Sequence, residues 1–315
     1  GPRRKTEAAV AMLNRMTTNA AEQLITLLVS CPDRRGIVAG LAQLLAGHGV
    51  NILDSDQHTD RDEGLFFQRI RCDLAEMTTD RGTLTRALDE VAERFSMNMQ
   101  VAEAKQKKRV AIFVSKYDHC LYDLLLRHRS GELNCDLALI ISNHPDLEAT
   151  AKQFGIDYHL VQKTRETKAA QEAVELELLK SYQIDLVVLA RYMQILSDSF
   201  VAQHKNRIIN IHHSFLPAFV GSKPYHRAHE RGVKLIGATA HYATATLDEG
   251  PIIEQGVTRC SHRDAVPDLI RKGRDLEKFV LAQAIRWHLQ DRVSVYGNKT
   301  VVFELPSSLR RRAGS

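Results

Sequence analysis

The chain has 315 residues, of which 44% are hydrophobic and 26% are charged, and its formal net charge is +5. This length suggests about two domains, and the near-average apolar share excludes disordered, collagen-like and coiled-coil proteins. No apolar run approaches the roughly 18 residues that a membrane span needs, so we expect no membrane-spanning segment.

The basic side chains that set the net charge gather at the two ends of the chain. Residues 1–20 carry four basic side chains against one acidic, and Arg310, Arg311 and Arg312 follow near the C-terminus. The rest is therefore close to neutral, and it holds no basic stripe interleaved with aromatic residues. We expect no nucleic-acid binding, a flexible leader at residues 1–21 and a basic tail at residues 304–315.

The five cysteines are scattered along the chain without a C-x-x-C pair. This spacing indicates neither a zinc ribbon nor a disulfide framework. We interpret the cysteines as reduced, mostly buried thiols of a cytoplasmic protein.

Residues 22–105 predict a small domain in which strands and helices follow the order βαββαβ. The pattern predicts strands at residues 23–31, 51–59, 65–72 and 97–102, and helices at residues 36–46 and 83–95. Asp33 stands at an N-cap position before the first helix. The order is that of a ferredoxin-like sandwich.

This segment resembles an ACT domain, a small regulatory module of amino-acid and one-carbon enzymes. The resemblance rests on the motifs CPDRRGIV at residues 31–38 and GVNI at residues 49–52. It implies a possible amino-acid effector bound by Asp33, Gly36, Ile37, Asn51 and Ile52. A helix start can hold the carboxylate of such a ligand on its backbone N–H groups. A domain that only pairs subunits is the alternative, and in either case we expect a homodimer or a homotetramer.

The charged run QKKR at residues 106–109 is the predicted linker, and residues 110–303 form the second predicted domain. Continuous apolar strands are expected at residues 110–115, 137–142, 157–160, 185–190, 208–211, 235–242 and 252–257. Helices are expected at residues 121–128, 145–154, 167–182 and 266–289, before a hairpin at residues 293–302. In the third of these helices, Ala170, Val174, Leu178 and Leu179 form the predicted apolar face. The alternation predicts a Rossmann-like α/β domain with a mostly parallel sheet, whose ligand site lies at the carboxyl ends of the strands.

Several common catalytic motifs are absent from the sequence. No G-x-G-x-x-G follows the first strand of this domain, and no G-x-x-x-x-G-K-[ST] is present, so dinucleotide and P-loop nucleotide sites are not supported. The lack of G-x-S-x-G and H-E-x-x-H excludes a nucleophile elbow and a zinc hydrolase of that type.

Polar side chains follow the strand at residues 208–211 and the later turn LDEGP at residues 247–251. Residues i and i+2 of a strand share a face, so Asn210 and His212 are predicted to project together and His213 elsewhere. The turn supplies the carboxylate of Asp248. An amide donor, an imidazole and a carboxylate suit acyl transfer to water or to an amine.

The motifs NIHHSFLPAF at residues 210–219, TAHY at residues 239–242 and LDEGPIIEQ at residues 247–255 resemble the tetrahydrofolate-dependent formyltransferase family. The motif LARYMQILS at residues 189–197 matches the segment that lines its pterin pocket. This resemblance implies that Asn210 donates to the formyl oxygen and that His212 stabilises the oxyanion and moves a proton to N10. It implies that Asp248 orients His212 and accepts a proton from water. The substrate pocket would be lined by Arg191, Tyr192, Met193, Ile195, Leu196, His241, Thr246 and Leu247.

One departure separates this chain from the glycinamide ribonucleotide transferases of that family. They carry a Gly-Ser-Gly phosphate loop after the first strand, where this chain reads VSKYDHC at residues 114–120. Without glycine the backbone cannot approach a phosphate closely, and Asp118 would repel one. With its N-terminal module, the chain resembles the formyltetrahydrofolate deformylase family.

That resemblance implies hydrolysis of 10-formyltetrahydrofolate to tetrahydrofolate and formate, which supplies purine and one-carbon metabolism, with no metal and no cofactor. Two alternatives stay open. One is a formyltransferase that acts on an amine such as glycinamide ribonucleotide, and the other is a non-catalytic folate or amino-acid sensor.

Overall fold

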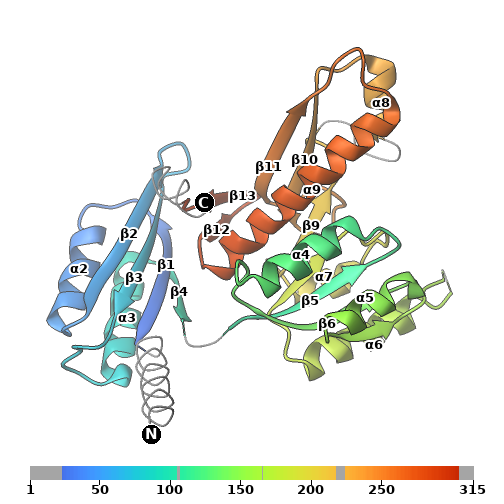
Figure 1. Cartoon of the computed structure of the whole chain (residues 1–315). Coiled ribbons are helices and arrows are strands. Elements are labelled where there is room, and N and C mark those ends of the chain that lie inside the picture. Colours follow the sequence, from blue (N-terminus) through green and yellow to red (C-terminus); the bar gives the residue numbers. More distant parts are fainter. Residues whose placement is uncertain (1–22, 105–106, 165, 218–223, 305–315) are drawn as a thin grey trace, which may run out of the picture. The chain divides into compact units, whose positions relative to one another are not determined.

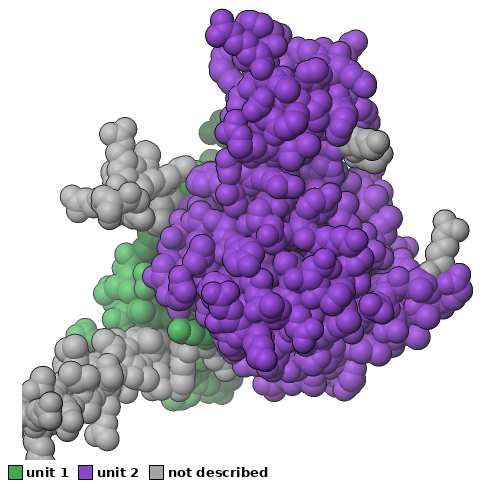
Figure 2. All heavy atoms as spheres, turned by 45° about the vertical axis from the view of Figure 1, so that its right-hand side comes forward, with its two compact units in different colours: residues 1–107, 301–315 green, residues 108–300 purple. Residues whose placement is uncertain are grey.

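The computed structural model describes residues 23–104, 107–164, 166–217 and 224–304 (Figure 1). The chain divides into two compact units, one of residues 1–107 with residues 301–315 and one of residues 108–300 (Figure 2). Within the described ranges, no helix is long and apolar enough to cross a membrane. All five cysteines are free thiols, and four of them are buried.

The first unit is a four-stranded antiparallel sheet with two helices. Its elements are β1 (Leu24–Pro32), α2 (Ile37–Gly47), β2 (Asn51–Asp60), β3 (Leu65–Asp73), α3 (Arg81–Phe95) and β4 (Asn98–Glu103). The strand order is β2-β3-β1-β4, and every neighbouring pair is antiparallel. The predicted βαββαβ sandwich is confirmed.

Alternation along β1 builds the core of this unit. Every second residue of β1 from Ile25 to Cys31 is buried in the same apolar cluster as Leu41 of α2 and Leu88 of α3. Because each buried aliphatic side chain of this size contributes roughly 1.5–3 kcal/mol, this face holds the helices on the sheet.

The start of α2 differs from the prediction. Its N-cap is Gly36, in the left-handed region with φ of +92°, and no side chain caps the helix. Asp33 lies too far before the first turn, and its backbone N–H donates instead to the carbonyl of Gly64 over 2.8 Å. The N-cap prediction for Asp33 was therefore wrong, whereas Asp80 does cap α3 by accepting from the N–H of Thr83.

The second unit is a seven-stranded sheet covered by helices. Its strands are β5 (Arg109–Val114), β6 (Asp136–Ser142), β7 (Asp157–Leu160), β8 (Leu186–Leu189), β9 (Ile208–His212), β10 (Leu235–Tyr242) and β11 (Ile252–Arg259). Its helices are α4 (His119–Arg129), α5 (Glu148–Gln153), α6 (Lys168–Ser181), α7 (Asp198–Gln203), α8 (Pro224–Arg231) and α9 (Val266–Leu289), with a 3₁₀ turn at Pro145–Leu147 before α5. The hairpin of β12 (Val293–Tyr296) and β13 (Lys299–Val302) follows. The sequence pattern did not predict α7 and α8.

The strand order places the site of this unit. The order is β11-β10-β9-β8-β5-β6-β7. The five strands from β9 to β7 pair in parallel, whereas β10 pairs antiparallel with both of its neighbours, β9 and β11. The chain leaves β5 on one side toward β6 and returns on the other side at β8. A crevice forms at the carboxyl ends of strands where the order reverses in this way.

Helices cover both faces of this sheet. Side chains of α6 and α7 pack with one face in a single apolar cluster, and α4 and α9 pack against each other along the sheet (Figure 1). The mostly parallel α/β class predicted from the sequence is confirmed.

Half of the predicted apolar face of α6 is confirmed, because Leu179 is buried in the apolar cluster and Leu178 packs against it, and the other half is wrong. Val174 is 48% exposed, and Ala170 is exposed as well. Glu172 and Glu175 are buried together with Leu179, and the two carboxylates surround the buried Nζ of Lys163 at 4.0 and 2.8 Å. An unpaired buried charge is costly, so the helix turns its carboxylates toward the lysine rather than its valine toward the core.

Candidate active site

A cavity of about 550 Å³ lies where β8 and β9 end, with walls from the loop after β8, from β10 and the turn after it, and from α8 and α9. Asn210, His212 and Asp248 all line it. The structure therefore brings the three predicted catalytic side chains together in one place.

The turn after β10 presents Asp248 in a left-handed backbone conformation. Its φ is +58°, which aspartate tolerates better than most residues. Two residues later, a Cβ on Gly250 would lie 1.7 Å from the carbonyl oxygen of Tyr242. Only glycine therefore lets this turn pack against the end of β10, and that contact fixes where the carboxylate points.

His212 and Asp248 form an oriented pair. The Nδ1 of His212 lies 3.2 Å from Oδ2 of Asp248, and because an ionised carboxylate can only accept, Nδ1 carries the proton. The Nε2 of His212 is buried and has no partner among the described residues. Burial would raise the pKa of Asp248, but the hydrogen bond and the charge of His212 outweigh it and hold that pKa well below its ordinary value. The carboxylate is thus ionised beside an imidazole nitrogen that is ready to exchange a proton.

Asn210 is oriented by a second histidine. The Nδ1 of His241 lies 2.9 Å from the carbonyl oxygen of Tyr242, which can only accept, so Nδ1 is protonated. The Nε2 of His241 then accepts from the amide nitrogen of Asn210 at 3.2 Å. The other amide hydrogen of Asn210 stays available for a ligand in the cavity.

The predicted substrate loop supplies the apolar wall. Met193, Ile195 and Leu247 line the cavity and are 54%, 59% and 56% exposed. Tyr192 and Leu196 also line it but are largely buried. Exposed apolar side chains gathered at a cavity mark a binding surface for an apolar, planar group.

Two of the predicted sets differ in the structure. Thr246 does not line the cavity, and its carbonyl accepts from the hydroxyl of Thr244 within the turn. The predicted effector residues separate as well. Gly36 and Asp33 follow the end of β1, next to Leu65, whereas Asn51 pairs with Asp73 at the far end of β3.

Eight strand steps separate these ends of the sheet, about 26 Å at the usual rise. Ile37 is 2% exposed and belongs to the core. Within one chain these residues therefore do not form a single site, because β1 and β2 point the same way and place their beginnings and ends apart.

His213 was predicted to point elsewhere, but it lines the cavity too. Strand alternation stops at His212, where β9 ends. The ring of His213 lies between those of His212 and Tyr225, with centroids 5.1 and 6.2 Å away. Burial, and next the positive charge of Arg191, lowers the pKa of His213 to about 4. It is a neutral wall of the site.

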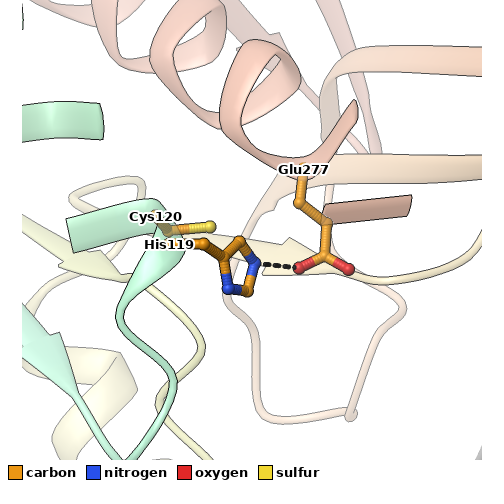
Figure 3. Close-up of side chains that lie close together, drawn as sticks. All are labelled: His119, Cys120 and Glu277. Atoms are coloured by element: carbon orange, nitrogen blue, oxygen red, sulfur yellow. Dashed lines mark hydrogen bonds and ion pairs between the residues drawn. The ribbon is translucent and has the colours of Figure 1, made fainter. Parts of the chain in front are cut away.

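A buried charge cluster forms another part of the cavity wall. Glu277 of α9 is 1% exposed, and it accepts a hydrogen bond from Nε2 of His119 at 2.8 Å (Figure 3). It also accepts one from the hydroxyl of Tyr225 at 2.8 Å. Arg191 Nε lies 3.5 Å away. Burial would raise the pKa of Glu277, but the bond from His119 and the charge of Arg191 lower it.

The sequence offered no local signal for this cluster, because His119 and Glu277 are 158 positions apart. Gly273, four residues before Glu277, is part of the reason why this cluster can form. A Cβ there would lie 2.0 Å from the hydroxyl oxygen of Tyr225. The glycine lets Tyr225 lie on α9 and reach the carboxylate.

The same cluster contains a set of atoms that could hold a metal ion. Ligand atoms of His119, Cys120 and Glu277 lie within 4.8 Å of one another (Figure 3). A metal-bound cysteine must be a thiolate, but burial raises the pKa of Cys120 well above its ordinary value. Arg191 already supplies positive charge to Glu277. The donor set fits a charge-balanced network better than a cation site, and the absence of a metal stays a prediction.

Comparison with known proteins identifies both units. The formyl transferase family model matches residues 108–285, and the ACT domain model matches residues 25–93. A formyltetrahydrofolate deformylase of Synechocystis sp. is 62% identical over 278 residues, which cover 88% of this chain and 98% of that protein.

Solved structures give the same result. The formyltetrahydrofolate deformylase of Pseudomonas syringae pv. tomato superposes with a TM-score of 0.87 at 48% identity, covering 90% of this chain and 95% of that one. A glycinamide ribonucleotide transformylase of Symbiobacterium toebii reaches a TM-score of 0.59 at 33% identity and covers 63% of this chain and 95% of its own. The likeness to the deformylases extends over nearly the whole molecule, and the chain belongs to the formyltetrahydrofolate deformylase family.

Proposed function

We propose that this chain hydrolyses 10-formyltetrahydrofolate to tetrahydrofolate and formate, with water as the acceptor of the formyl group. The observation that carries the proposal is the shared cavity of Asn210, His212 and an ionised Asp248. The names of its relatives, formyltetrahydrofolate deformylase in each case, support the same reaction.

The cavity suits a folate in size and in lining. Its volume of about 550 Å³ lies within the range of small-molecule sites. The apolar side chains of Met193, Ile195 and Leu247 would contact the pterin ring, and the formyl group would lie toward β9. We further propose that the reaction serves one-carbon and purine metabolism, because both the folate and formate carry one-carbon units.

The first chemical step is addition of water to the formyl carbon. The free amide hydrogen of Asn210 and a protonated Nε2 of His212 donate to the formyl oxygen, which takes the electron pair of the C=O bond. Asp248 accepts the proton of water on Oδ1, the oxygen that His212 does not hold. An oxyanion donor contributes about 10²–10³ in rate, and general acid–base help about 10²–10⁴.

Collapse of the tetrahedral intermediate releases the folate. His212 donates its Nε2 proton to N10, the bond between N10 and the formyl carbon breaks, and the oxyanion re-forms its C=O bond. Asp248 then loses its proton to solvent, Nε2 of His212 takes up a proton from solvent, and formic acid leaves as formate after losing a proton to solvent. Asp248 also holds the imidazole in the orientation that this transfer needs.

Replacement of Asp248 by Asn tests the mechanism. Asparagine tolerates the left-handed backbone of this turn, so the fold is retained while the charge and the proton acceptor are lost. We expect turnover to fall by about 10³–10⁴ with folate binding largely unchanged. Formate release from 10-formyltetrahydrofolate is the measurement, and near-normal release from the variant would contradict the mechanism.

The likeness to a transformylase gives a second candidate, transfer of the formyl group to an amine. The buried carboxylate of Glu277 in the cavity wall and the exposed Asp118 after β5 oppose a phosphorylated acceptor. Adding glycinamide ribonucleotide to the assay separates the two reactions. Hydrolysis predicts unchanged formate release, whereas transfer predicts a formylated amine in its place.

A further inference from the structure

Arg191 is held in the catalytic cavity at a conformational cost. Its φ is +61°, in the left-handed region that long side chains rarely adopt. Its side chain is 10% exposed and lines the cavity. No hydrogen bond from its guanidinium to a described residue is formed, and Nε is buried without a partner.

Neutralising Glu277 explains only part of this arrangement. That carboxylate already accepts from His119 and Tyr225 at 2.8 Å, and Arg191 stays at 3.5 Å without a hydrogen bond. The guanidinium stacks instead over the ring of Tyr117, with 5.0 Å between Cζ and the ring centroid. The Nε–H of Arg191 is buried without a hydrogen-bond acceptor, which costs free energy, so the N–H groups of the guanidinium are expected to meet a ligand.

We propose that Arg191 forms a carboxylate subsite of the cavity and that its ligand is the formate product. The inference rests on the proposed function, which generates formate in the same cavity. Two parallel N–H groups of a guanidinium match the two oxygens of a carboxylate. Stacking on Tyr117 holds the guanidinium plane in place for this contact.

The groups around Arg191 select a single negative charge. Glu277 of α9 lies beside it, and Arg274 of the same helix also lies over the ring of Tyr117, with its Cζ 5.9 Å from the ring centroid. His119 of α4, Tyr225 of α8 and the neutral His213 after β9 complete the surroundings. Arg191 and Arg274 together exceed the charge of Glu277 by one, so a monoanion balances these side chains, whereas a phosphate dianion would exceed them.

The subsite also provides a second position for formate in the cavity, away from Asp248. Formate forms beside the ionised Asp248, which repels it. Arg191 acts on His213 through its positive charge, and His213 adjoins His212. Transfer from the catalytic trio to Arg191 therefore moves the product from a carboxylate to a guanidinium without leaving the cavity.

The test is a titration of the full chain with ¹³C-labelled formate, followed by NMR without folate. The variants are Arg191→Gln, the double variant Arg191→Gln with Glu277→Gln, and the control Arg271→Gln, whose side chain is 69% exposed on α9. We expect Arg191→Gln to weaken formate binding about 10- to 100-fold, the usual effect of losing a charged hydrogen-bond partner. Arg271→Gln should bind as the unaltered chain does.

The double variant separates binding from charge balance. It restores neutrality around position 277, so its thermal stability should match that of the unaltered chain while formate binding stays weak. Recovery of formate binding in the double variant would assign Arg191 to neutralising Glu277 and overturn the proposal.

Two further results would overturn it: no saturable formate binding to the unaltered chain, or displacement of formate by lower concentrations of inorganic phosphate. Because the titration involves no turnover, a failed deformylase assay would count against the proposed reaction and would leave the binding result readable.

Discussion

Each catalytic side chain is oriented by one specific acceptor or donor. The carboxylate of Asp248 fixes the proton of His212, and the carbonyl of Tyr242 fixes that of His241, which in turn orients Asn210. The first chain of contacts ends in the turn after β10, and the second ends at the last residue of β10, against which that turn packs. Small shifts of this turn should therefore change the chemistry more than the binding of folate.

Replacement of Gly250 by Ala tests the position of this turn. The new Cβ would lie 1.7 Å from the backbone oxygen of Tyr242, so the turn must move and carry Asp248 with it. A displacement of about 1 Å can cost 10²-fold in rate, and we expect kcat to fall by at least this factor. The control is Gly47→Ala, where a Cβ meets nothing within 4 Å. Equal kcat values for the two variants would contradict the role given to the turn.

At this scale the sequence predicts the residues that lie within local motifs. Asn210, His212 and Asp248 are recognisable because one strand end and one turn carry them. Glu277 and His119 are not, because α9 and α4 bring together side chains 158 positions apart with no pattern around either. Thr246 shows the reverse error, since being next to a functional residue in a turn does not decide which way a side chain points.

Helix α6 holds the loop of residues 191–197, which carries part of the apolar wall, by hydrogen bonds to two of its carboxylates. Glu175 accepts from the hydroxyl of Tyr192 at 2.9 Å, and Glu172 accepts from the backbone N–H of Ser197 at 3.1 Å. Directly after β5, the hydroxyl of Ser115 accepts from the N–H of Met193 at 3.0 Å. These bonds hold both ends of the loop that carries the apolar wall.

Replacement of Glu175 by Leu tests this support. It leaves Lys163 buried with Glu172 at 4.0 Å as its remaining carboxylate partner among the described residues, and breaking a buried pair costs about 3–5 kcal/mol. Urea unfolding measures that loss. Adding Lys163→Met removes the stranded charge and should recover most of the stability.

The two variants separate the buried charge from the position of the loop. Tyr192 has lost its acceptor in both, so KM for the folate should stay raised in the double variant. A KM that returns with stability would show that α6 contributes only to folding. The sequence could not predict this role, because helical periodicity assumes that the apolar face is the buried one, and Lys163 reverses that on α6.

For the whole molecule, buried histidines couple stability to pH. Burial lowers the pKa of His288 to about 3, and burial with the charge of Arg191 lowers that of His213 to about 4. Each stays neutral in the folded chain while the unfolded chain takes up a proton below about pH 6.5. Their stabilising contribution is therefore complete above pH 6.5 and is lost as the pH falls toward the folded values.

As the pH is lowered from 6.5 toward the folded pKa values, we expect the free energy of unfolding to decrease by about 1.4 kcal/mol per pH unit for each histidine. The single tryptophan, Trp287, is 2% exposed on α9, and its fluorescence reports on the second unit. Urea unfolding at pH 7.5 and at pH 5.5 gives the slope. The variant His288→Gln should show a slope smaller by one proton, and an unchanged slope would contradict the assignment.

The arrangement of the whole chain could be predicted to the level of element order and sheet class. Alternation and apolar runs determine both, as β1 and β5 illustrate. The sequence pattern could not show whether Gly36 and Asn51 belong to one effector site, because this depends on which strand ends are neighbours in the sheet.

The pairing of β9 with β10 determines when activity can arise during synthesis and folding of the chain. Asn210 and His212 come from one strand of this pair, and His241 and the turn of Asp248 come with the other. We expect a partly synthesised chain to be inactive, because the reacting groups come together only when these two strands have paired. Recovery of catalysis during refolding therefore reports that β9 and β10 have paired.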